Sequence, residues 1–136
     1  IARGRGTIVV VSSAAAYQPI PYTATYAATK AFELFFVEAL AGELAGTGVR
    51  TIAVCPGPTR TEFGAVSGTS SPRWIPAETS AGVVAATFRA LEKGRIRVAT
   101  GPLSKVTTVL ASLLPRRLIV WGAGVTHRKF AQKRPH

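Results

Sequence analysis

The sequence of 136 residues contains no methionine, a single cysteine and only six acidic residues. Because no methionine precedes the opening run IARGRGTIVVV, we expect the chain to be the C-terminal part of a longer protein. One cysteine excludes an internal disulfide, and Cys55 lies in the apolar run TIAVCPG, so a buried, reduced thiol is predicted. Such a thiol fits a cytoplasmic protein. His127 and His136 stand alone, and the sequence therefore predicts no metal site.

Acidic residues are absent from the last third of the chain. Seventeen Lys and Arg against six Asp and Glu give a net charge of +11, and all six acids lie at or before Glu92. Ten basic residues follow without a single acid, so the C-terminal segment carries the basicity. Long hydrophobic runs are also missing, and no stretch there approaches the ~20 residues that cross a bilayer. The sequence therefore predicts no transmembrane helix.

The apolar patterns that are present alternate between strand and helix. Short β-branched runs predict strands, the first of them buried on both faces, and three- and four-residue spacing predicts helices. In chain order these elements are a strand at 6–13, a helix at 25–45, a strand at 48–58, a helix at 76–94 and a strand at 95–101. This alternation builds a parallel sheet with helical crossovers, so we predict an α/β fold. A Gly- and Ser-rich loop is expected at 59–75.

The helix at 25–45 carries an apolar stripe that is rich in phenylalanine. Its members are Ala28, Phe32, Phe35, Phe36, Ala39 and Leu40. Such a stripe either packs on the sheet as a core face or contacts a second subunit. Both interpretations remain open from the sequence.

Three polar side chains are expected to meet at one edge of the sheet. Ser13 ends the first strand, and the Pro56-Gly57 break ends the second, so both open onto the carboxyl edge where open α/β sheets bind ligands. Tyr26 and Lys30 lie four residues apart near the start of the intervening helix and share one of its faces.

This combination of side chains suits proton transfer. A free tyrosine has a pKa of ~10, too high for exchange near neutrality, and a fixed cation one helical turn away favours the phenolate. A serine hydroxyl can donate a hydrogen bond to a carbonyl oxygen on which negative charge develops. Taken singly, each motif is more often a turn or a surface pair than a site.

The stretches GTIVVVSS, YAATK and VRTIAVCPGPTRTEF, in this order and spacing, resemble the short-chain dehydrogenase/reductase family over about residues 4–100. The family's catalytic serine lies thirteen residues before its tyrosine, which selects Ser13 rather than Ser12, and its Tyr-x-x-x-Lys motif matches Tyr26 and Lys30. The resemblance implies a Rossmann-like doubly wound parallel sheet, of which about the last three strands are present.

The resemblance also implies an oxidoreductase that interconverts a carbonyl and an alcohol by hydride transfer. Tyr26 would exchange the proton with the substrate, and Ser13 would orient the carbonyl. Lys30 would hold the ribose hydroxyls of the nicotinamide cofactor and favour the tyrosine phenolate. The substrate is expected to be lipophilic, and the 25–45 helix is expected to pair with its copy in a homo-oligomer.

The implied cofactor is NAD or NADP, with NADP the favoured of the two. Besides Tyr26 and Lys30, its binding residues would be Pro56, Gly57, Thr59 through its backbone and Thr61 through its hydroxyl. Residues 62–75 would belong to the loop that covers the substrate.

The family's Gly-rich cofactor turn is absent from this sequence. We therefore predict that residues 1–101 form the C-terminal half of a short-chain dehydrogenase/reductase domain and that 102–136 form a basic amphipathic extension. This chain alone is expected to be inactive. The alternative is a catalytically inactive, truncated remnant whose basic tail binds an anionic membrane surface.

The extension combines an apolar helical stripe with basic residues. The stripe consists of Leu103, Val106, Leu110 and Leu113, with Leu114 beside them. A solvated, partly disordered basic end is one interpretation, and a peripheral contact with an anionic membrane is another. Nucleic-acid binding ranks last, because no recognisable module or interleaved aromatic pattern accompanies the charge.

Overall fold

The computed structural model describes residues 1–61 and 76–131, so most of the expected 59–75 loop lies outside the described residues. The elements in chain order are β1 (Gly6–Val11), the 3-10 helix η1 (Ala14–Tyr17), α1 (Ala24–Glu43), β2 (Val49–Cys55), β3 (Thr59–Arg60), β4 (Glu78–Thr79), α3 (Ser80–Glu92), β5 (Arg97–Ala99), α4 (Pro102–Leu113) and α5 (Arg116–Ala131).

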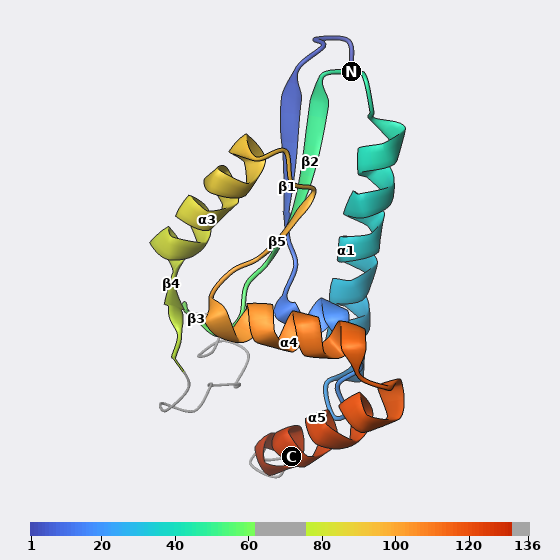
Figure 1. Cartoon of the computed structure of the whole chain (residues 1–136), viewed down its shortest axis with the longest axis vertical. Helices are drawn as coiled ribbons and strands as arrows, with labels where there is room; N and C mark the ends of the chain where they lie inside the picture. Colours follow the sequence, from blue (N-terminus) through green and yellow to red (C-terminus); the bar gives the residue numbers. More distant parts are fainter. Residues whose placement is uncertain (62–75, 132–136) are drawn as a thin grey trace.

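Three strands form a parallel sheet in the order β1-β2-β5, with Val9 of β1 opposite Ile52 of β2 (Figure 1). Successive residues of β2 point to opposite faces of the sheet. Ala53 accordingly packs with Leu34 of α1, while Ile52 packs with Leu91 of α3. Helices thus cover both faces, which confirms the α/β fold with a doubly wound parallel sheet.

The first strand is more exposed than its sequence predicts. Ile8, Val9 and Val11 are 41%, 46% and 60% exposed, so the prediction that this strand is buried on both faces is wrong. Among the described strands only β2 lies beside β1, which places β1 at an edge of the sheet. A β-branched run indicates a strand, but it does not distinguish an edge position from a central one.

Helix α1 buries a different face from its phenylalanine stripe. Leu34 and Val37 are fully buried against the sheet, whereas Phe32, Phe35 and Phe36 are each more than half exposed. The rings of Phe32 and Phe36 stack with their centroids 5.9 Å apart. The interpretation of the stripe as a core face is therefore wrong, and a contact with a second subunit stays a prediction.

Glycine is required where the chain turns from α1 into β2. Gly46 and Gly48 have φ values of +79° and +77°, a conformation that residues with a Cβ rarely adopt. A Cβ on Gly48 would also collide with the carbonyl of Gly4.

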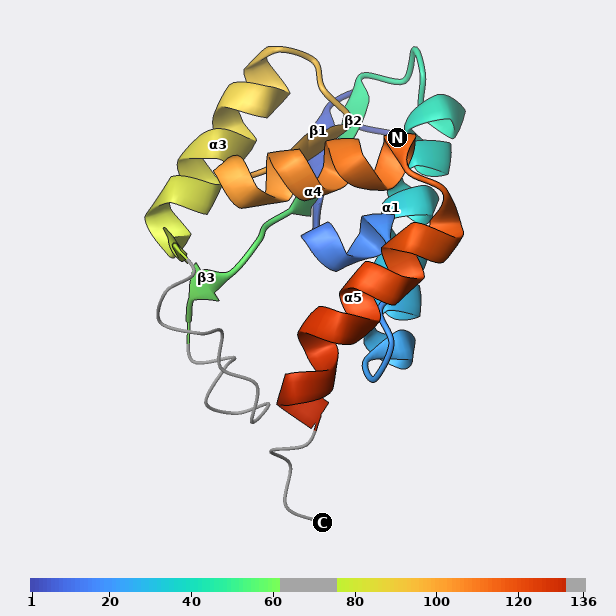
Figure 2. The ribbon, with the colours of Figure 1, turned by 60° about the horizontal axis from the view of Figure 1, so that its bottom comes forward.

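The last two helices lie at the carboxyl end of the strands. Helix α4 crosses this end and packs against η1, and α5 lies next to it (Figures 1 and 2). Ala123 fixes α5 by packing with Ile20 and Ala27. A disordered basic end is therefore the wrong interpretation for residues 102–131, which are helical as far as Ala131. Within the described residues, each helix is too short or too polar to span a membrane.

Candidate active site

The ends of β1 and β2 are joined at the carboxyl edge of the sheet. The Ser12 amide donates a 2.8 Å hydrogen bond to the Val54 carbonyl, and the Ala14 amide donates a 2.9 Å bond to the Pro56 carbonyl. Ser13 lies between these two bonds. The structure thus places Ser13 beside the turn that begins at Pro56, on the edge that the strand order predicts.

Ser13 begins η1 as its N-terminal cap. Its Oγ accepts a 3.1 Å hydrogen bond from the amide of Ala15, a common arrangement for a capping serine. The side chain is half-buried. Because the oxygen is used as an acceptor, the hydroxyl hydrogen is left for donation to a further group.

Lys30 is held at the end of β1 by three hydrogen bonds from its ammonium group. Nζ lies 3.1 Å from the Val11 carbonyl oxygen and 2.9 and 3.2 Å from the two carboxylate oxygens of Glu33. The backbone carbonyl of Lys30 in turn accepts a 2.8 Å bond from the buried hydroxyl of Ser12. Both the main chain and the side chain of Lys30 are therefore tied to the strand end that bears Ser13.

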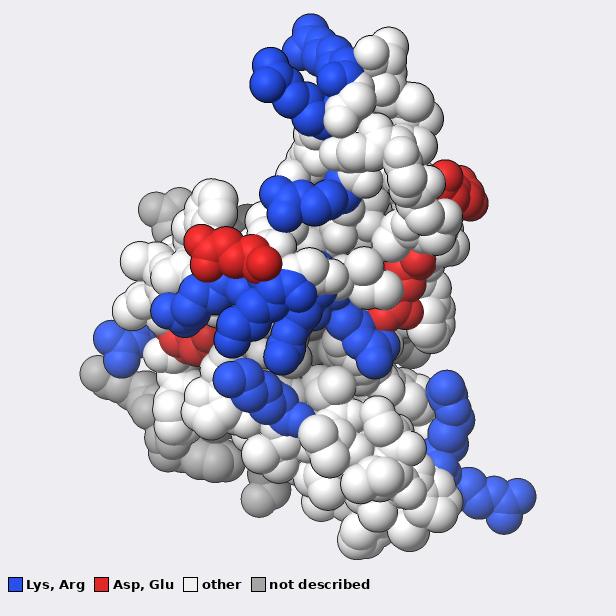
Figure 3. All heavy atoms as spheres, turned by 45° about the horizontal axis from the view of Figure 1, so that its top comes forward, with Lys and Arg blue, Asp and Glu red and all other residues white. Residues whose placement is uncertain are grey.

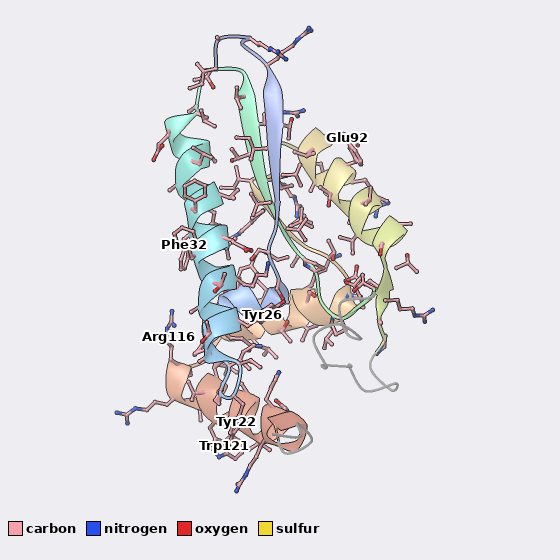
Figure 4. The ribbon with its side chains drawn as sticks, turned by 180° about the vertical axis from the view of Figure 1, so that it is seen from behind. Tyr22, Tyr26, Phe32, Glu92, Arg116 and Trp121 are labelled. Atoms are coloured by element: carbon pink, nitrogen blue, oxygen red, sulfur yellow. The ribbon has the colours of Figure 1, made fainter. Side chains whose placement is uncertain are left out.

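Tyr26 stands in the first turn of α1, one helical turn before Lys30. Its side chain is 39% exposed, and Figure 4 shows it near the place where η1 meets α1. Ala16 of η1 packs with Leu34 of α1, which fixes the orientation of the two helices. Ser13, Tyr26 and Lys30 thus come from elements that pack directly on one another.

The remaining predicted residues lie on the strand exit after β2. The Thr59 hydroxyl donates a 3.0 Å hydrogen bond to the Gly57 carbonyl and so closes the turn, while the Thr59 backbone belongs to β3. Thr61 is exposed and is the last described residue before the gap. The predicted substrate loop, residues 62–75, lies outside the described residues.

Sequence reasoning missed three residues around this site. Ser12 anchors Lys30, and Glu33 pairs with its ammonium; the i,i+3 spacing of Lys30 and Glu33 was the available signal. The third, Ser104 of α4, has a buried hydroxyl without a hydrogen-bond partner, and it lies so close to Gly57 that a Cβ there would collide with it. No local sequence pattern predicts the contact between Ser104 and Gly57, because the two residues lie far apart in the chain.

Cys55 is fully buried beneath this edge, as predicted. Burial raises the pKa of its thiol, which keeps the group protonated and unreactive. Tyr17 of η1 lies nearby, and burial, followed by the charge of the Cys55 thiolate, raises the pKa of its phenol well above the usual range. Neither group suits proton exchange near neutrality.

The arrangement offers the donors and acceptors that a nicotinamide riboside requires. Lys30 supplies a cation at the end of the sheet, Ser13 supplies a hydroxyl, and the turn from Pro56 to Thr59 supplies backbone groups beside them. These residues fit the nicotinamide half of a dinucleotide site.

The chain is similar to known short chain dehydrogenases. A family model described as short chain dehydrogenase matches residues 1–70. The dehydrogenase/reductase SDR family member 4 of Bos taurus is 45% identical over 64 residues, which are 47% of this chain and 23% of that protein.

Solved structures show the same likeness over more of the chain. A short chain dehydrogenase from Burkholderia cenocepacia, crystallised with NADP, has a TM-score of 0.70 and 28% identity, with coverage of 96% of this chain and 48% of that one. A structure from work on the stereoselectivity of a 7beta-hydroxysteroid dehydrogenase has a TM-score of 0.72 and 26% identity, with coverage of 90% and 49%. The chain thus spans about half the length of these structures and about a quarter of the curated relative. It belongs to the short chain dehydrogenase family.

Proposed function

We propose that the full-length protein is an NAD(P)-dependent oxidoreductase that interconverts a carbonyl and an alcohol by hydride transfer. The observation that carries this proposal is the attachment of Lys30 to the end of β1. Ser12 binds its carbonyl and Val11 binds its ammonium, so the helix that carries Tyr26 is fixed against the strand that leads into Ser13.

Each of the three side chains has a separate task. Tyr26 Oη donates a proton to the carbonyl oxygen during reduction and accepts it during oxidation. The Ser13 hydroxyl donates a hydrogen bond to the same oxygen and so stabilises the negative charge that develops there. The Lys30 ammonium, one helical turn from Tyr26, would orient the bound cofactor.

Lys30 and Tyr26 would also hold the nicotinamide ribose, with Pro56, Gly57, Thr59 and Thr61 along the nicotinamide ring. When bound, the reduced cofactor supplies the hydride that goes to the carbonyl carbon. The Lys30 ammonium has three donors, and Val11 and Glu33 engage it here, so ribose hydroxyls would displace part of that set. We favour NADP over NAD, and the NADP complex of the Burkholderia cenocepacia protein supports a nicotinamide cofactor in general.

The substrate we propose is a lipophilic ketone or the corresponding secondary alcohol. The likeness to the structure from work on a 7beta-hydroxysteroid dehydrogenase supports a bulky, apolar compound. A cytoplasmic location is proposed with it, and the buried thiol of Cys55 supports a reducing compartment.

We further propose that two copies pair through α1. Phe32, Phe35 and Phe36 project from the sheet-distal side of this helix and are 67%, 63% and 53% exposed. In a monomer these three phenylalanines expose a contiguous apolar area to water, which is unfavourable in free energy. Pairing of two copies would remove this area from water.

Isotope transfer tests the proposed reaction. The full-length protein would be incubated with NADPH or NADH deuterated at C4 and with a panel of lipophilic ketones. We expect deuterium on the carbinol carbon of the product. If the folded full-length protein transfers no deuterium to any ketone with either cofactor, the alternative of a catalytically inactive remnant is favoured instead. The chain of residues 1–136 alone is expected to be inactive in the same assay.

A further inference from the structure

Helix α4 turns its apolar side away from the protein. Its least exposed residues are the small or polar Ser104, Thr107, Thr108 and Ala111. Its exposed large apolar residues are Leu103, Val106, Val109, Leu110 and Leu113, which are 39% to 75% exposed. At 100° per residue these five lie on one side of the helix.

Close packing explains why the inner side is small and polar. Ser104 abuts Gly57, and η1 lies against the same side of α4. The hydroxyls of Ser104 and Thr108 are buried there without hydrogen-bond partners, an arrangement that costs free energy. The usual amphipathic arrangement is therefore inverted, and the outer side of α4 has the composition of a surface that is covered in use.

Helix α5 continues the apolar surface and adds basic residues. Ile119 and Ala123 face the protein and are nearly fully buried, whereas Trp121 is 71% exposed. Leu118 and Val125 are also more than half exposed, and they lie on the same side of the helix as Trp121. Basic side chains lie one turn before Trp121 and two turns after it, at Arg117 and Arg128, and both are exposed.

Charge identifies the partner that this surface fits. From Lys93 to the end the chain has ten basic residues and no acidic residue. Figure 3 shows an uncharged area at the lower end of the molecule, where Figure 1 places α4 and α5, with Lys and Arg atoms on two sides of it. A second copy of this chain would bring cations against cations. An anionic bilayer instead offers acyl chains to the apolar centre of this surface and negative headgroups to the basic residues at its border.

We propose that the exposed apolar residues of α4, together with Leu118, Trp121 and Val125 of α5, form a docking surface for an anionic lipid bilayer. We call it the α4–α5 face. Neither helix is long and apolar enough to span a bilayer. Each lies instead in the interface, with Leu and Val side chains among the acyl chains. Trp121 sits at headgroup level, and Arg117 and Arg128 contact lipid phosphates.

Vesicle flotation of the full-length protein tests this proposal. The vesicles contain phosphatidylcholine with about one third phosphatidylglycerol, or phosphatidylcholine alone. We expect binding to the anionic vesicles at low salt and its loss in ~1 M salt, where the Debye length is about 3 Å. The apolar variant Leu113→Gln/Trp121→Gln should bind at least about tenfold more weakly. The charge variant Arg117→Glu/Arg128→Glu should lose at least as much.

Matched controls come from α3, which lies away from the α4–α5 face in Figure 1. Val84→Gln/Phe88→Gln also replaces one exposed aliphatic and one exposed aromatic residue, and Arg89→Glu/Lys93→Glu makes the same change of charge. Both should float like the unchanged protein. Circular dichroism melts identify any variant that has lost its fold.

Three outcomes would overturn the proposal. The first is no flotation with anionic vesicles, and the second is equal flotation with neutral ones. The third is equal loss of binding in the α3 controls. If flotation is absent and Leu113→Gln/Trp121→Gln converts an oligomer to a smaller species in light scattering, the α4–α5 face is an interface between copies. Flotation does not depend on catalysis, so the docking proposal can fail while the proposed reaction holds, and the reverse.

Discussion

The Ser12 hydroxyl donates a 2.8 Å hydrogen bond to the backbone carbonyl of Lys30, across eighteen positions of sequence. The bond ties the end of β1 to the second turn of α1. Ser12 is only 4% exposed, so little water competes for the bond. Ser12 therefore acts as a positioning residue for the neighbouring Ser13 and for the helix that carries Tyr26.

Replacement of Ser12 by alanine should lower kcat more than it raises the KM of the carbonyl substrate, because binding groups remain while their alignment is lost. We expect kcat to fall about tenfold, in line with small misplacements of catalytic groups. The lost hydrogen bond should lower the free energy of unfolding by about 1 kcal/mol. Ser12→Thr keeps the hydroxyl and should recover most of kcat. Unchanged kinetics in Ser12→Ala would contradict the positioning role.

Removal of the Glu33 carboxylate should strengthen cofactor binding. Glu33 occupies the Lys30 ammonium at 2.9 Å, and both side chains are partly exposed, so this ion pair is worth about 0.2–1 kcal/mol. In Glu33→Gln no carboxylate competes with the ribose hydroxyls for the Lys30 ammonium. The cofactor should therefore bind up to about fivefold more tightly. Isothermal titration with NADPH and NADH measures the change. Glu38→Gln is the control, because Glu38 lies on the same helix as Glu33 and forms a 2.8 Å ion pair with Arg97 of β5. Weaker cofactor binding in Glu33→Gln alone would show that the ion pair supports the site instead.

The core face of α1 can be tested by two neighbouring truncations. Leu34 is 2% exposed and packs between the sheet and η1, so Leu34→Ala should lower the free energy of unfolding by about 2–5 kcal/mol. Phe35 is 63% exposed, and Phe35→Ala should cost less than about 1 kcal/mol at concentrations where the protein is monomeric. Urea unfolding monitored by circular dichroism measures both. A larger loss for Phe35 than for Leu34 would reverse the assignment of the two faces.

Alkaline pH should destabilise the fold through Tyr17 and Cys55. Burial raises the pKa of both groups in the folded protein, so the unfolded chain loses these protons first as the pH rises. Their stabilising contribution is complete below the unfolded pKa values of ~8.5 for cysteine and ~10 for tyrosine, and it declines above them. We expect the free energy of unfolding to fall between about pH 8 and 11. Tyr17→Phe should flatten that fall, and a slope equal to that of the unchanged protein would contradict the burial of Tyr17.

Local patterns predicted most of the fold because the strands and helices of this chain have strong periodicity. The β-branched runs gave β1 and β2, and the glycines after α1 end the helix where positive φ is needed. The patterns could not predict which apolar faces are covered. The β1 run contains the same residue types as a central strand, and the stripe of Phe32, Phe35 and Phe36 is more apolar than the face that α1 buries. Exposure of both depends on neighbours, which periodicity does not encode.

The candidate site was predictable in its members and not in its contacts. Strand order places Ser13 and the Pro56 turn on one edge, and helical spacing pairs Tyr26 with Lys30. The anchor from Ser12 and the buried hydroxyl of Ser104 beside Gly57 arise from packing between distant segments. These contacts depend on the assembled fold, so a local motif carries no signal for them.

The most direct test of the central claim compares Tyr26→Phe with Tyr22→Phe in the full-length protein. Both tyrosines are exposed and lie four residues apart, so the two variants remove the same hydroxyl from neighbouring positions. Steady-state reduction of a turned-over ketone is measured together with the dissociation constant of the cofactor. The proposed acid/base role predicts a loss of kcat on the order of 10²–10⁴-fold in Tyr26→Phe alone, with cofactor binding retained within a few-fold. Equal activity in the two variants would contradict the assignment of Tyr26 as the proton-transfer group.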